Sequence, residues 1–322
     1  MSELLLEVRD LRTHFFTRRG VVKAVDGVSF SLRAGETLGI VGESGSGKSI
    51  TALSLVRLVP RPAARIVGGQ VLLQGEDLLR KSESEMRRIR GEKIAMILQD
   101  PLTSLNPVLS IGDQVTEAIT LHQGLRGRSL WERAVDILRK LKIPSPEQRM
   151  SSFPHQMSGG MRQRVVGAIA ISCQPKVLIA DEPTTSLDVT VQAQYLRLLK
   201  EIQAESGLAI LFITHDFGVV AKMCDRVAVM YAGRIVEMAD VRDLFTTPAH
   251  PYTEALMRSV PKLEEQVDRL YSIEGQPPAP DRLPPGCPFA PRCPYVMDRC
   301  RTEYPPEVTV SVGHTASCWR RA

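Results

Sequence analysis

The sequence lacks any long hydrophobic run. Its longest apolar stretches, such as Val165 to Ile171 and Val177 to Ala180, fall far short of the roughly 18 residues that a membrane-spanning helix needs. The N-terminal residues MSELLLEVRD have neither the basic start nor the extended apolar segment of a signal peptide. We therefore predict a cytoplasmic protein that does not itself cross a membrane.

The sequence also lacks a strong imbalance of charge. Its 41 Lys and Arg are spread among 36 Asp and Glu, which favours a solvated surface over a nucleic-acid partner. With 43% hydrophobic residues, the chain can bury a large core and is not disordered. Its six cysteines would be reduced in the cytoplasm, so a cluster of them points to metal or redox chemistry before disulfides. Cys173 and Cys224 lie in apolar segments and are predicted to be core residues.

Short apolar runs alternate with turns and helical segments along most of the chain. Strands are expected at Leu4 to Val8, Val21 to Phe30, Glu36 to Val41, Gly68 to Gly75, Ile94 to Leu98, Val177 to Ala180, Ala209 to Thr214 and Val227 to Tyr231. Helices are expected at Ser84 to Arg90 and from about Val191 to Glu205. This alternation predicts an α/β fold with a mainly parallel sheet.

Two regions depart from that alternation. Between Asp113 and Met150 apolar residues recur at helical spacing behind Ser129 and Glu132, which form a capping-box pattern and indicate a small helical insertion. The last 52 residues, from Tyr271, contain ten of the 22 prolines and four of the six cysteines. So much proline predicts a loop-rich tail that needs a cross-link or a metal site to stabilise its fold.

The segment GESGSGKS, residues 42–49, matches the pattern of a phosphate-binding loop between a strand and a helix. Its glycines allow successive backbone N–H groups to curl around phosphates at a helix N-terminus, where partial positive charge favours anions. A lysine supplies the point charge, and the final serine places a hydroxyl where Mg²⁺ can bind. The predicted ATP-binding residues are Gly42, Glu43, Ser44, Gly45, Ser46, Gly47, Lys48 and Ser49.

The segment VLIADE, residues 177–182, is an apolar run that ends in two carboxylates. The carboxyl end of a strand is where a parallel sheet presents its ligand-binding residues. Asp181 is predicted to hold Mg²⁺, directly or through water. Glu182 is predicted to accept a hydrogen bond from the attacking water and to act as general base.

Between these two motifs, Met157 to Arg164 reads MSGGMRQR and resembles the signature motif of ATP-binding-cassette (ABC) ATPases. That family's remaining motifs have counterparts in this chain: Gln99 in ILQDP resembles the Q-loop, Ser186 to Asp188 the D-loop and His215 in FITHD the switch histidine. The resemblance covers about Leu4 to Asp240. It implies a cassette ATPase core with an antiparallel β subdomain and a helical subdomain at about residues 100–172.

The resemblance also implies roles for these residues. Ser158, Gly159 and Gly160 would cap the γ-phosphate bound to the opposite subunit, so one chain cannot build a complete site. Gln99 would contact Mg²⁺ and the water, together with Ser49 and Asp181 as ligands, and His215 would hydrogen-bond the γ-phosphate. Asp188 belongs to the D-loop.

The adenine ring would stack on an aromatic residue near the start of the chain. Phe15 precedes Ala24 by the spacing seen in the family. Phe16 is the rival, and a core role fits either residue almost as well.

Three further sequence motifs narrow the resemblance to the dipeptide and oligopeptide importer branch: QDPLTSLNP at the Q-loop, FPHQ before the signature and HPYTEAL at residues 250–256.

The expected domains are a nucleotide-binding domain at residues 1–255 and a C-terminal tail at residues 256–322. The implied protein hydrolyses ATP to import peptides at the cytoplasmic face of the cell membrane. Its implied partners are a second, different ATPase, two membrane permeases and an extracytoplasmic peptide-binding protein. The alternatives are nickel, glutathione or another small solute, or a soluble cassette ATPase outside transport.

The four tail cysteines, Cys287, Cys293, Cys300 and Cys318, are spaced by five, six and seventeen residues. Zinc sites more often contain cysteine pairs two to four residues apart, whereas four thiolates suit a [4Fe-4S] cluster. Some members of the peptide-importer branch resemble this chain in carrying a cluster there. Arg292 and Arg299 would offset the thiolate charge. Zinc, or free thiols and disulfides, are the alternatives.

Overall fold

The computed structural model describes residues 3–260 and 271–322, which group into two compact units. The first consists mainly of Leu73–Ile213. The second combines Glu7–Ser31, Thr37–Leu72 and Thr214–Ala322. None of the helices in the described ranges combines the length and the hydropathy that crossing a bilayer requires.

The first unit contains three parallel strands. β6 (Ile94–Ile97), β7 (Val177–Asp181) and β8 (Ala209–Ile213) pair in that order. Every residue of β7 and β8 is buried. Such continuous apolar runs are typical of parallel strands that are covered on both faces. The helix α8 (Val189–Ser206) connects β7 to β8.

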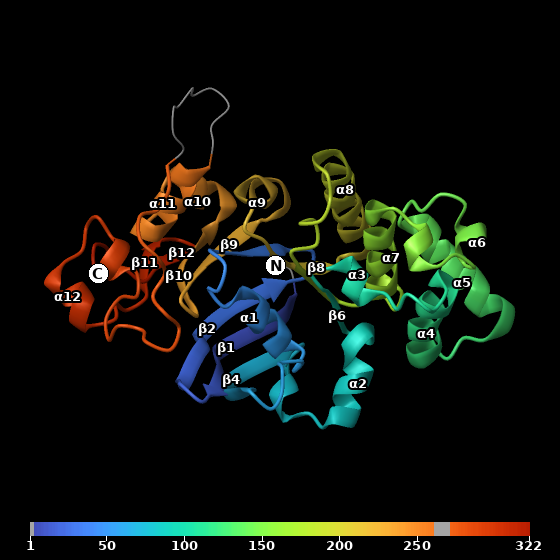
Figure 1. Ribbon diagram of the computed structural model, residues 1–322, viewed down its shortest axis with the longest axis horizontal. Helices are drawn as coiled ribbons and strands as arrows, with labels where there is room; N and C mark the ends of the chain where they lie inside the picture. Colours follow the sequence, from blue (N-terminus) through green and yellow to red (C-terminus); the bar gives the residue numbers. More distant parts are fainter. Residues whose placement is uncertain (1–2, 261–270) are drawn as a thin grey trace. The chain divides into compact units, whose positions relative to one another are not determined.

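The helical part of the first unit holds α4 (Ile111–Gln123), α5 (Gly127–Lys140) and α7 (Gly159–Ile171), which pack against one another (Figure 1). The shorter elements of this unit are β5 (Glu76–Asp77), η1 (Leu78–Arg80), α2 (Glu83–Glu92), α3 (Pro101–Ser104), α6 (Pro146–Arg149) and η2 (Pro154–Gln156).

The predicted capping pair at Ser129 and Glu132 is wrong. The helix α5 begins two residues before Ser129, and Arg126 stands at the N-cap without a side-chain cap. The Ser129 hydroxyl donates to the Arg126 carbonyl at 2.9 Å, and Glu132 pairs with Arg128 at 2.7 Å. Both side chains are therefore engaged within the first turns of the helix.

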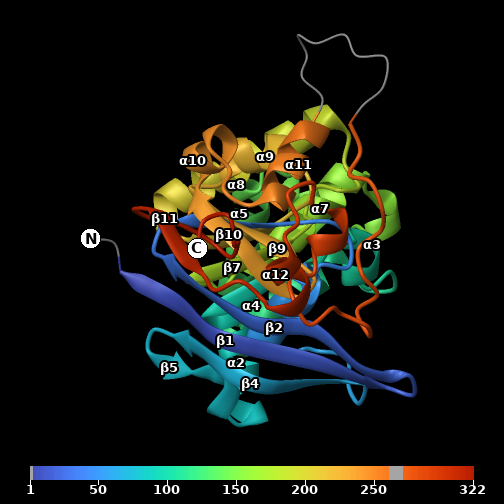
Figure 2. The ribbon, with the colours of Figure 1, turned by 90° about the vertical axis from the view of Figure 1, so that its left-hand side faces the viewer.

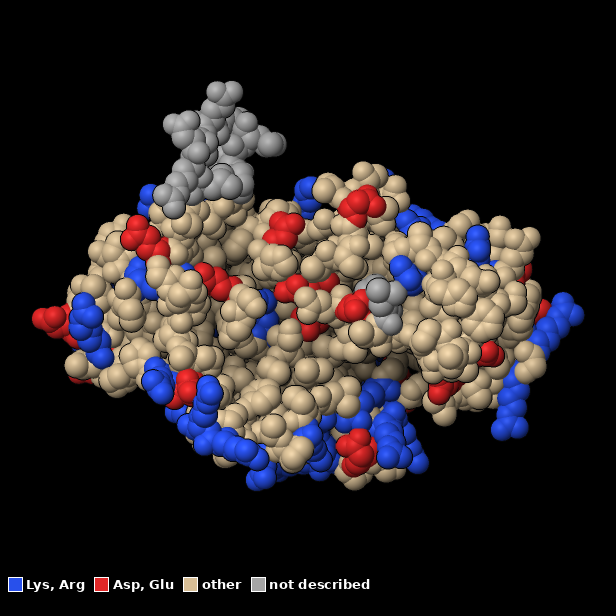
Figure 3. Space-filling model, in the orientation of Figure 1, with Lys and Arg blue, Asp and Glu red and all other residues tan. Residues whose placement is uncertain are grey.

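The second unit contains an antiparallel-type subdomain built on long strands. β1 (Leu4–Thr17), β2 (Gly20–Arg33) and β4 (Ala64–Leu73) are ordered β2-β1-β4 and run side by side (Figure 2). Figure 3 shows Lys and Arg along the region of these strands, with Asp and Glu among them. Arg9 pairs with Glu7 at 2.8 Å and Arg12 with Asp10 at 2.9 Å, so neighbouring acids offset these two cations.

A second group of strands in this unit leads into the glycine-rich loop at residues 42–49. β3 (Thr37–Val41) pairs in parallel with β9 (Arg226–Tyr231), and β9 pairs antiparallel with β10 (Arg234–Asp240). The helices are α1 (Lys48–Leu55), α9 (Phe217–Met223), α10 (Val241–Thr246) and α11 (Pro251–Ser259). The predicted α/β class with parallel and antiparallel pairing is confirmed.

The tail extends the second unit with little regular structure. Its elements are η3 (Ala290–Arg292), α12 (Asp298–Thr302), β11 (Val308–Ser311) and β12 (His314–Ala316), and β12 adds to β10 in antiparallel pairing. Buried Glu237 of β10 accepts hydrogen bonds from the backbone N–H groups of Ala249 and His250 and lies 2.8 Å from His314 Nε2. One carboxylate thus joins the tail strand, β10 and the start of α11.

Candidate functional site

The phosphate-type loop, residues 42–49, connects buried β3 to the N-terminus of α1 in the second unit. Two of its glycines are required by close packing. A Cβ on Gly42 (φ 154°) would lie 2.2 Å from the Met230 carbonyl oxygen, and one on Gly47 (φ 106°) would lie 2.2 Å from the Ala24 carbonyl oxygen. A side chain at either position would displace the backbone of the loop.

Lys48 is buried, and its ammonium group points back over the loop. Its Nζ donates to the carbonyl oxygens of Gly42 at 2.8 Å and Glu43 at 3.0 Å. A cation held above curled backbone at a helix N-terminus favours an anion there. This geometry suits the predicted phosphate contact.

A cavity of about 540 Å³ adjoins the loop. Phe15, Lys23 and Ala24 line it from β1 and β2, and Glu43 to Ser46 line it from the loop. Phe16 does not line it: that ring is 45% exposed, and the Arg65 guanidinium lies 5.3 Å from its centroid. The geometry therefore favours Phe15 over Phe16 as the adenine-stacking residue.

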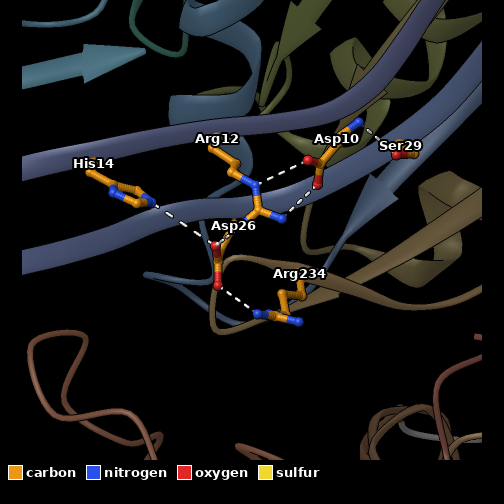
Figure 4. A network of polar contacts seen from close by, with 6 residues as sticks. All are labelled: Asp10, Arg12, His14, Asp26, Ser29 and Arg234. Carbon is orange, nitrogen blue, oxygen red and sulfur yellow. Dashed lines mark hydrogen bonds and ion pairs between the residues drawn. The ribbon is translucent and has the colours of Figure 1, made fainter. Parts of the chain in front are cut away.

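A polar network fixes the strands that form this wall of the cavity (Figure 4). Buried Asp26 accepts hydrogen bonds from Arg12 at 3.1 Å and Arg234 at 2.7 Å, with His14 at 4.0 Å. Burial raises the pKa of Asp26, but the Arg234 hydrogen bond and the charges of Arg234, Lys23 and Arg12 outweigh burial and lower the pKa overall. Asp26 is therefore ionised at neutral pH.

The carboxylates predicted to bind Mg²⁺ and to act as general base lie at the end of β7 in the first unit. Asp181 is buried as the last residue of the strand, and the next residue, Glu182, is half-buried. Glu182 has φ 46°, a left-handed conformation that is uncommon for a residue with a side chain. Its backbone N–H donates to the Ile213 carbonyl at 2.9 Å. Strained backbone of this kind concentrates at functional sites.

The structure brings predicted Gln99 to Glu182. Gln99 Nε2 donates to Glu182 Oε2 at 3.1 Å, and the Thr185 hydroxyl donates to the same oxygen at 3.0 Å. Thr185 was not predicted from the sequence, although it lies three residues after the carboxylate. These two donors orient the carboxylate that would serve as the base.

Predicted His215 is exposed and follows β8 by two residues. In the second unit, Thr214 donates its backbone N–H to the Ile40 carbonyl at 3.2 Å. The segment that carries His215 thus starts beside the strand that leads into the phosphate-type loop.

The signature and D-loop residues occupy two helix N-termini in the first unit. Ser158 is exposed at the N-cap of α7 and accepts from the Met161 N–H at 3.3 Å. Asp188 is exposed at the N-cap of α8 and accepts from the Val191 N–H at 3.0 Å. A Cβ on Gly160 would lie 2.6 Å from Val191 Cγ1, so the two helices approach closely at this glycine.

Sequence reasoning missed two side chains that contact the phosphate-type loop. Tyr252 Oη accepts from the Glu43 backbone N–H at 2.8 Å, and the Arg292 guanidinium contacts both Glu43 carboxylate oxygens, at 2.7 and 2.9 Å. Tyr252 belongs to the HPYT string, whose only apparent local function was a helix start. His250 is indeed the N-cap of α11, and Pro251 is its first residue.

The four tail cysteines line one small cavity beside α11, together with His250 and Phe289. Burial, and then the neighbouring thiols Cys300, Cys318 and Cys293, raise the pKa of Cys287 to about 11. Among the described residues, however, no group of three or more His, Cys, Asp and Glu is placed to hold a metal ion. Cys173 and Cys224 are buried as predicted.

Arg292 and Arg299, which were expected to offset the charge of the thiolates, form ion pairs with glutamates instead. Arg292 pairs with Glu43, and Arg299 pairs with Glu303 at 2.9 Å while lying 3.5 Å from the Trp319 ring centroid. Burial raises the pKa of both Cys293 and Cys318, and the charge of Arg320 offsets only part of that rise.

A strand, a glycine-constrained loop with a buried lysine, and a strand ending in two carboxylates define a nucleotide-hydrolysing P-loop protein. Comparison with known proteins narrows this class. The family model for ABC transporters matches residues 25–185, and the model for the oligopeptide/dipeptide transporter C-terminal region matches residues 236–300.

Curated relatives match over nearly their whole length. A probable peptide ABC transporter ATP-binding protein of Sinorhizobium fredii is 52% identical over 99% of this chain and 96% of its own. The oligopeptide transport ATP-binding protein AppD of Bacillus subtilis is 50% identical over 98% of this chain and 96% of its own. The chain belongs to the ABC transporter ATPases, in the family of oligopeptide and dipeptide transport ATP-binding proteins.

Solved structures agree with the fold. A dimeric ATP-binding cassette in a post-hydrolysis state bound to ADP and Pi has a TM-score of 0.66 and 25% identity, and it covers 74% of this chain and 99% of its own. A structure of CbiO1 from Clostridium perfringens, part of the ABC transporter complex CbiONQ, has a TM-score of 0.64 and 27% identity, and it covers 76% of this chain and 92% of its own.

Proposed function

We propose that this ATPase lies at the cytoplasmic face of the cell membrane and powers the import of dipeptides or oligopeptides. The supporting observation is the match of residues 236–300 to the oligopeptide/dipeptide transporter C-terminal region. The relatives at about half identity, which carry peptide, oligopeptide or dipeptide transport in their names, support the same substrate class. The working complex then contains two permeases, a second, different ATPase and an extracytoplasmic peptide-binding protein.

In this proposal the nucleotide lies with its base on Phe15 and its phosphates on residues 42–49. Asp181, Ser49 and Gln99 would hold Mg²⁺, which would neutralise phosphate charge. Glu182 takes the proton of the attacking water, and His215 contacts the γ-phosphate. No part of this chemistry needs the tail cysteines.

Purification of the tagged chain from membranes tests the transport assignment. We expect two hydrophobic permeases and a second cassette to co-purify. A strain lacking the gene should lose uptake of labelled di- or tripeptides and regain it with the wild-type gene. Loss of nickel or glutathione uptake with normal peptide uptake would instead assign the ATPase to another solute. Absence of membrane partners would favour a role outside transport.

We also propose that Ser158, Gly159 and Gly160 act on ATP bound to the facing cassette, with Asp188 at the same contact. Ser158→Arg should reduce hydrolysis in the partner cassette's site by about a hundredfold, because a bulky cation replaces a donor for the phosphate. ATP turnover by the mixed pair measures this. Ser151→Arg is the matched control, since Ser151 is an exposed serine just outside the signature. Full activity of the Ser158→Arg pair would contradict a head-to-tail arrangement.

We further propose that Cys287, Cys293, Cys300 and Cys318 hold a [4Fe-4S] cluster. The support is their convergence on one cavity and the suitability of four thiolates as its ligands. A cluster separates its thiolates more widely than a single ion does, which is compatible with the lack of a single-ion site among the described residues. The cluster would stabilise the fold of the proline-rich tail by linking its segments.

Protein purified without oxygen should be brown and contain iron and acid-labile sulfide. Cys293→Ser should lose the colour and the iron because it removes one ligand, whereas Cys173→Ser, in the core of the other unit, should keep both. Colourless wild-type protein with stoichiometric zinc, or with no metal, would rule out the cluster.

A further inference from the structure

The tail reaches the phosphate-type loop through a partly buried ion pair between Arg292 and Glu43. Arg292 lies at the end of η3, and its side chain is only 4% exposed. It contacts both carboxylate oxygens of Glu43, the second residue of the loop, and donates to the Tyr231 hydroxyl at 3.2 Å. A planar guanidinium that binds a carboxylate with two nitrogens fixes both distance and orientation.

Tyr252 holds the same loop residue from a second side. The Glu43 backbone N–H donates to Tyr252 Oη in α11, so this N–H is not one of the groups that the loop would offer to a phosphate. The rings of Tyr231, Tyr252 and Phe289 pack with centroids 4.5 to 5.4 Å apart. Strand β9, helix α11 and the tail therefore meet in one aromatic cluster, and Tyr252 of this cluster contacts Glu43.

A different part of the tail forms a wall of the base cavity. Pro277, Pro278, Ala279, Pro280 and Leu283 line the cavity that Phe15 and the loop also line. These side chains are apolar, and prolines lose little conformational freedom when a ligand orders them. They offer a preformed apolar surface for the base within the same cavity as Phe15.

We propose that the tail is part of the nucleotide site: Arg292 and Tyr252 are positioning residues for the phosphate loop through Glu43, and residues 277–283 form a wall that contacts the base. This inference rests on the proposed placement of ATP on residues 42–49 and Phe15. It assigns the C-terminal region a direct effect on nucleotide affinity.

The two contacts predict different ligand dependences. Loss of the Glu43–Arg292 pair should weaken any ligand that carries the phosphates, because it releases the loop. Loss of the apolar wall should weaken ATP alone, because inorganic tripolyphosphate has no base. Isothermal titration of the full chain with ATP and with tripolyphosphate, both with Mg²⁺, separates these effects.

For the loop contact we expect Glu43→Gln and Arg292→Ala each to weaken both ligands by about tenfold. The double variant should be no weaker than the worse single one, because both remove the same pair. Arg292→Lys should lie between Arg292→Ala and the wild type, since it keeps the charge but not the two-nitrogen contact. Arg301→Ala, an exposed arginine of the same tail, is the control.

For the wall we expect Leu283→Ala to weaken ATP several-fold and to leave tripolyphosphate unchanged. Unchanged affinities in the Glu43 and Arg292 variants, or additive effects in the double variant, would overturn the positioning role. An unchanged ratio of ATP to tripolyphosphate affinity in Leu283→Ala would overturn the wall. If Arg292→Ala does not fold, the isosteric Glu43→Gln still decides the first question.

Failure of the underlying site is distinguishable from failure of this inference. If Lys48→Ala leaves ATP affinity unchanged, ATP does not bind on residues 42–49 and the placement itself is wrong. If Lys48→Ala weakens ATP but the Glu43, Arg292 and Leu283 variants do not, the placement holds and the tail has no part in it.

Discussion

Replacing Glu182 by Gln is expected to slow ATP hydrolysis by about a hundred- to ten-thousandfold, the range that a general base contributes. The substitution keeps the shape of the side chain. Its amide oxygen can still accept from Gln99 and Thr185, which contact Glu182 Oε2 at 3.1 and 3.0 Å. An amide cannot take the proton of the attacking water, so binding should persist while turnover stops.

The variant should also leave the fold intact. The left-handed backbone of Glu182, with φ 46°, costs a similar amount with either side chain because both carry a Cβ. We therefore expect unchanged thermal unfolding, wild-type ATP affinity and a larger share of closed cassette dimers with ATP.

Single-turnover hydrolysis and titration with ATP measure the two properties separately. Glu205→Gln is the matched control, because that carboxylate is exposed and pairs with Lys140 on the surface of the same unit. Steady turnover of Glu182→Gln at the wild-type rate would remove Glu182 from the role of base.

Local sequence patterns were sufficient for the strands and the motifs that end them. β8 and the first four residues of β7 are continuous apolar runs, and the structure buries every residue of both strands. The carboxylates and His215 could be placed at strand ends because a motif directly after such a run has few alternative positions. The glycines of the loop were predicted from the same local chemistry, and their close contacts with Met230 and Ala24 add the steric reason.

Contacts between distant segments could not be predicted in this way. Glu43 contacts Tyr252 and Arg292, which lie 209 and 249 residues away in the sequence. No sequence motif links either residue to Glu43. A single sequence gives no register between such segments. Proximity in the sequence predicts Arg292 beside the thiolates, whereas the folded chain pairs it with Glu43.

Even a local pattern fails where two conformations satisfy the same residues. Ser129 and Glu132 have the spacing of a capping box, but the Ser129 hydroxyl donates to the Arg126 carbonyl and the helix begins at Gly127. A serine within the first turn can satisfy its hydroxyl on the preceding carbonyl as well as on a helix N–H. The pattern predicted the helix but not its first residue.

Replacing Lys48 by Ala is expected to weaken ATP binding by roughly ten- to hundredfold, which corresponds to about 1.5–3 kcal/mol for a hydrogen bond to a charged group. Lys48 is buried, and its ammonium lies over the loop on the Gly42 and Glu43 carbonyls. Removing it takes away the positive charge that would face the phosphates in the proposed site, together with two hydrogen bonds to the backbone of the loop.

Lys48→Met separates the charge from the packing, since Met retains most of the aliphatic stem. If charge dominates, the Ala and Met variants should lose similar affinity for ATP. Lys222→Ala, an exposed lysine of the same unit, should bind ATP as the wild type does. Titration calorimetry, with circular dichroism to verify folding, gives the answer. Wild-type affinity in both Lys48 variants would mean that the phosphates bind elsewhere, whereas loss in the Ala variant alone would assign the effect to packing around the stem.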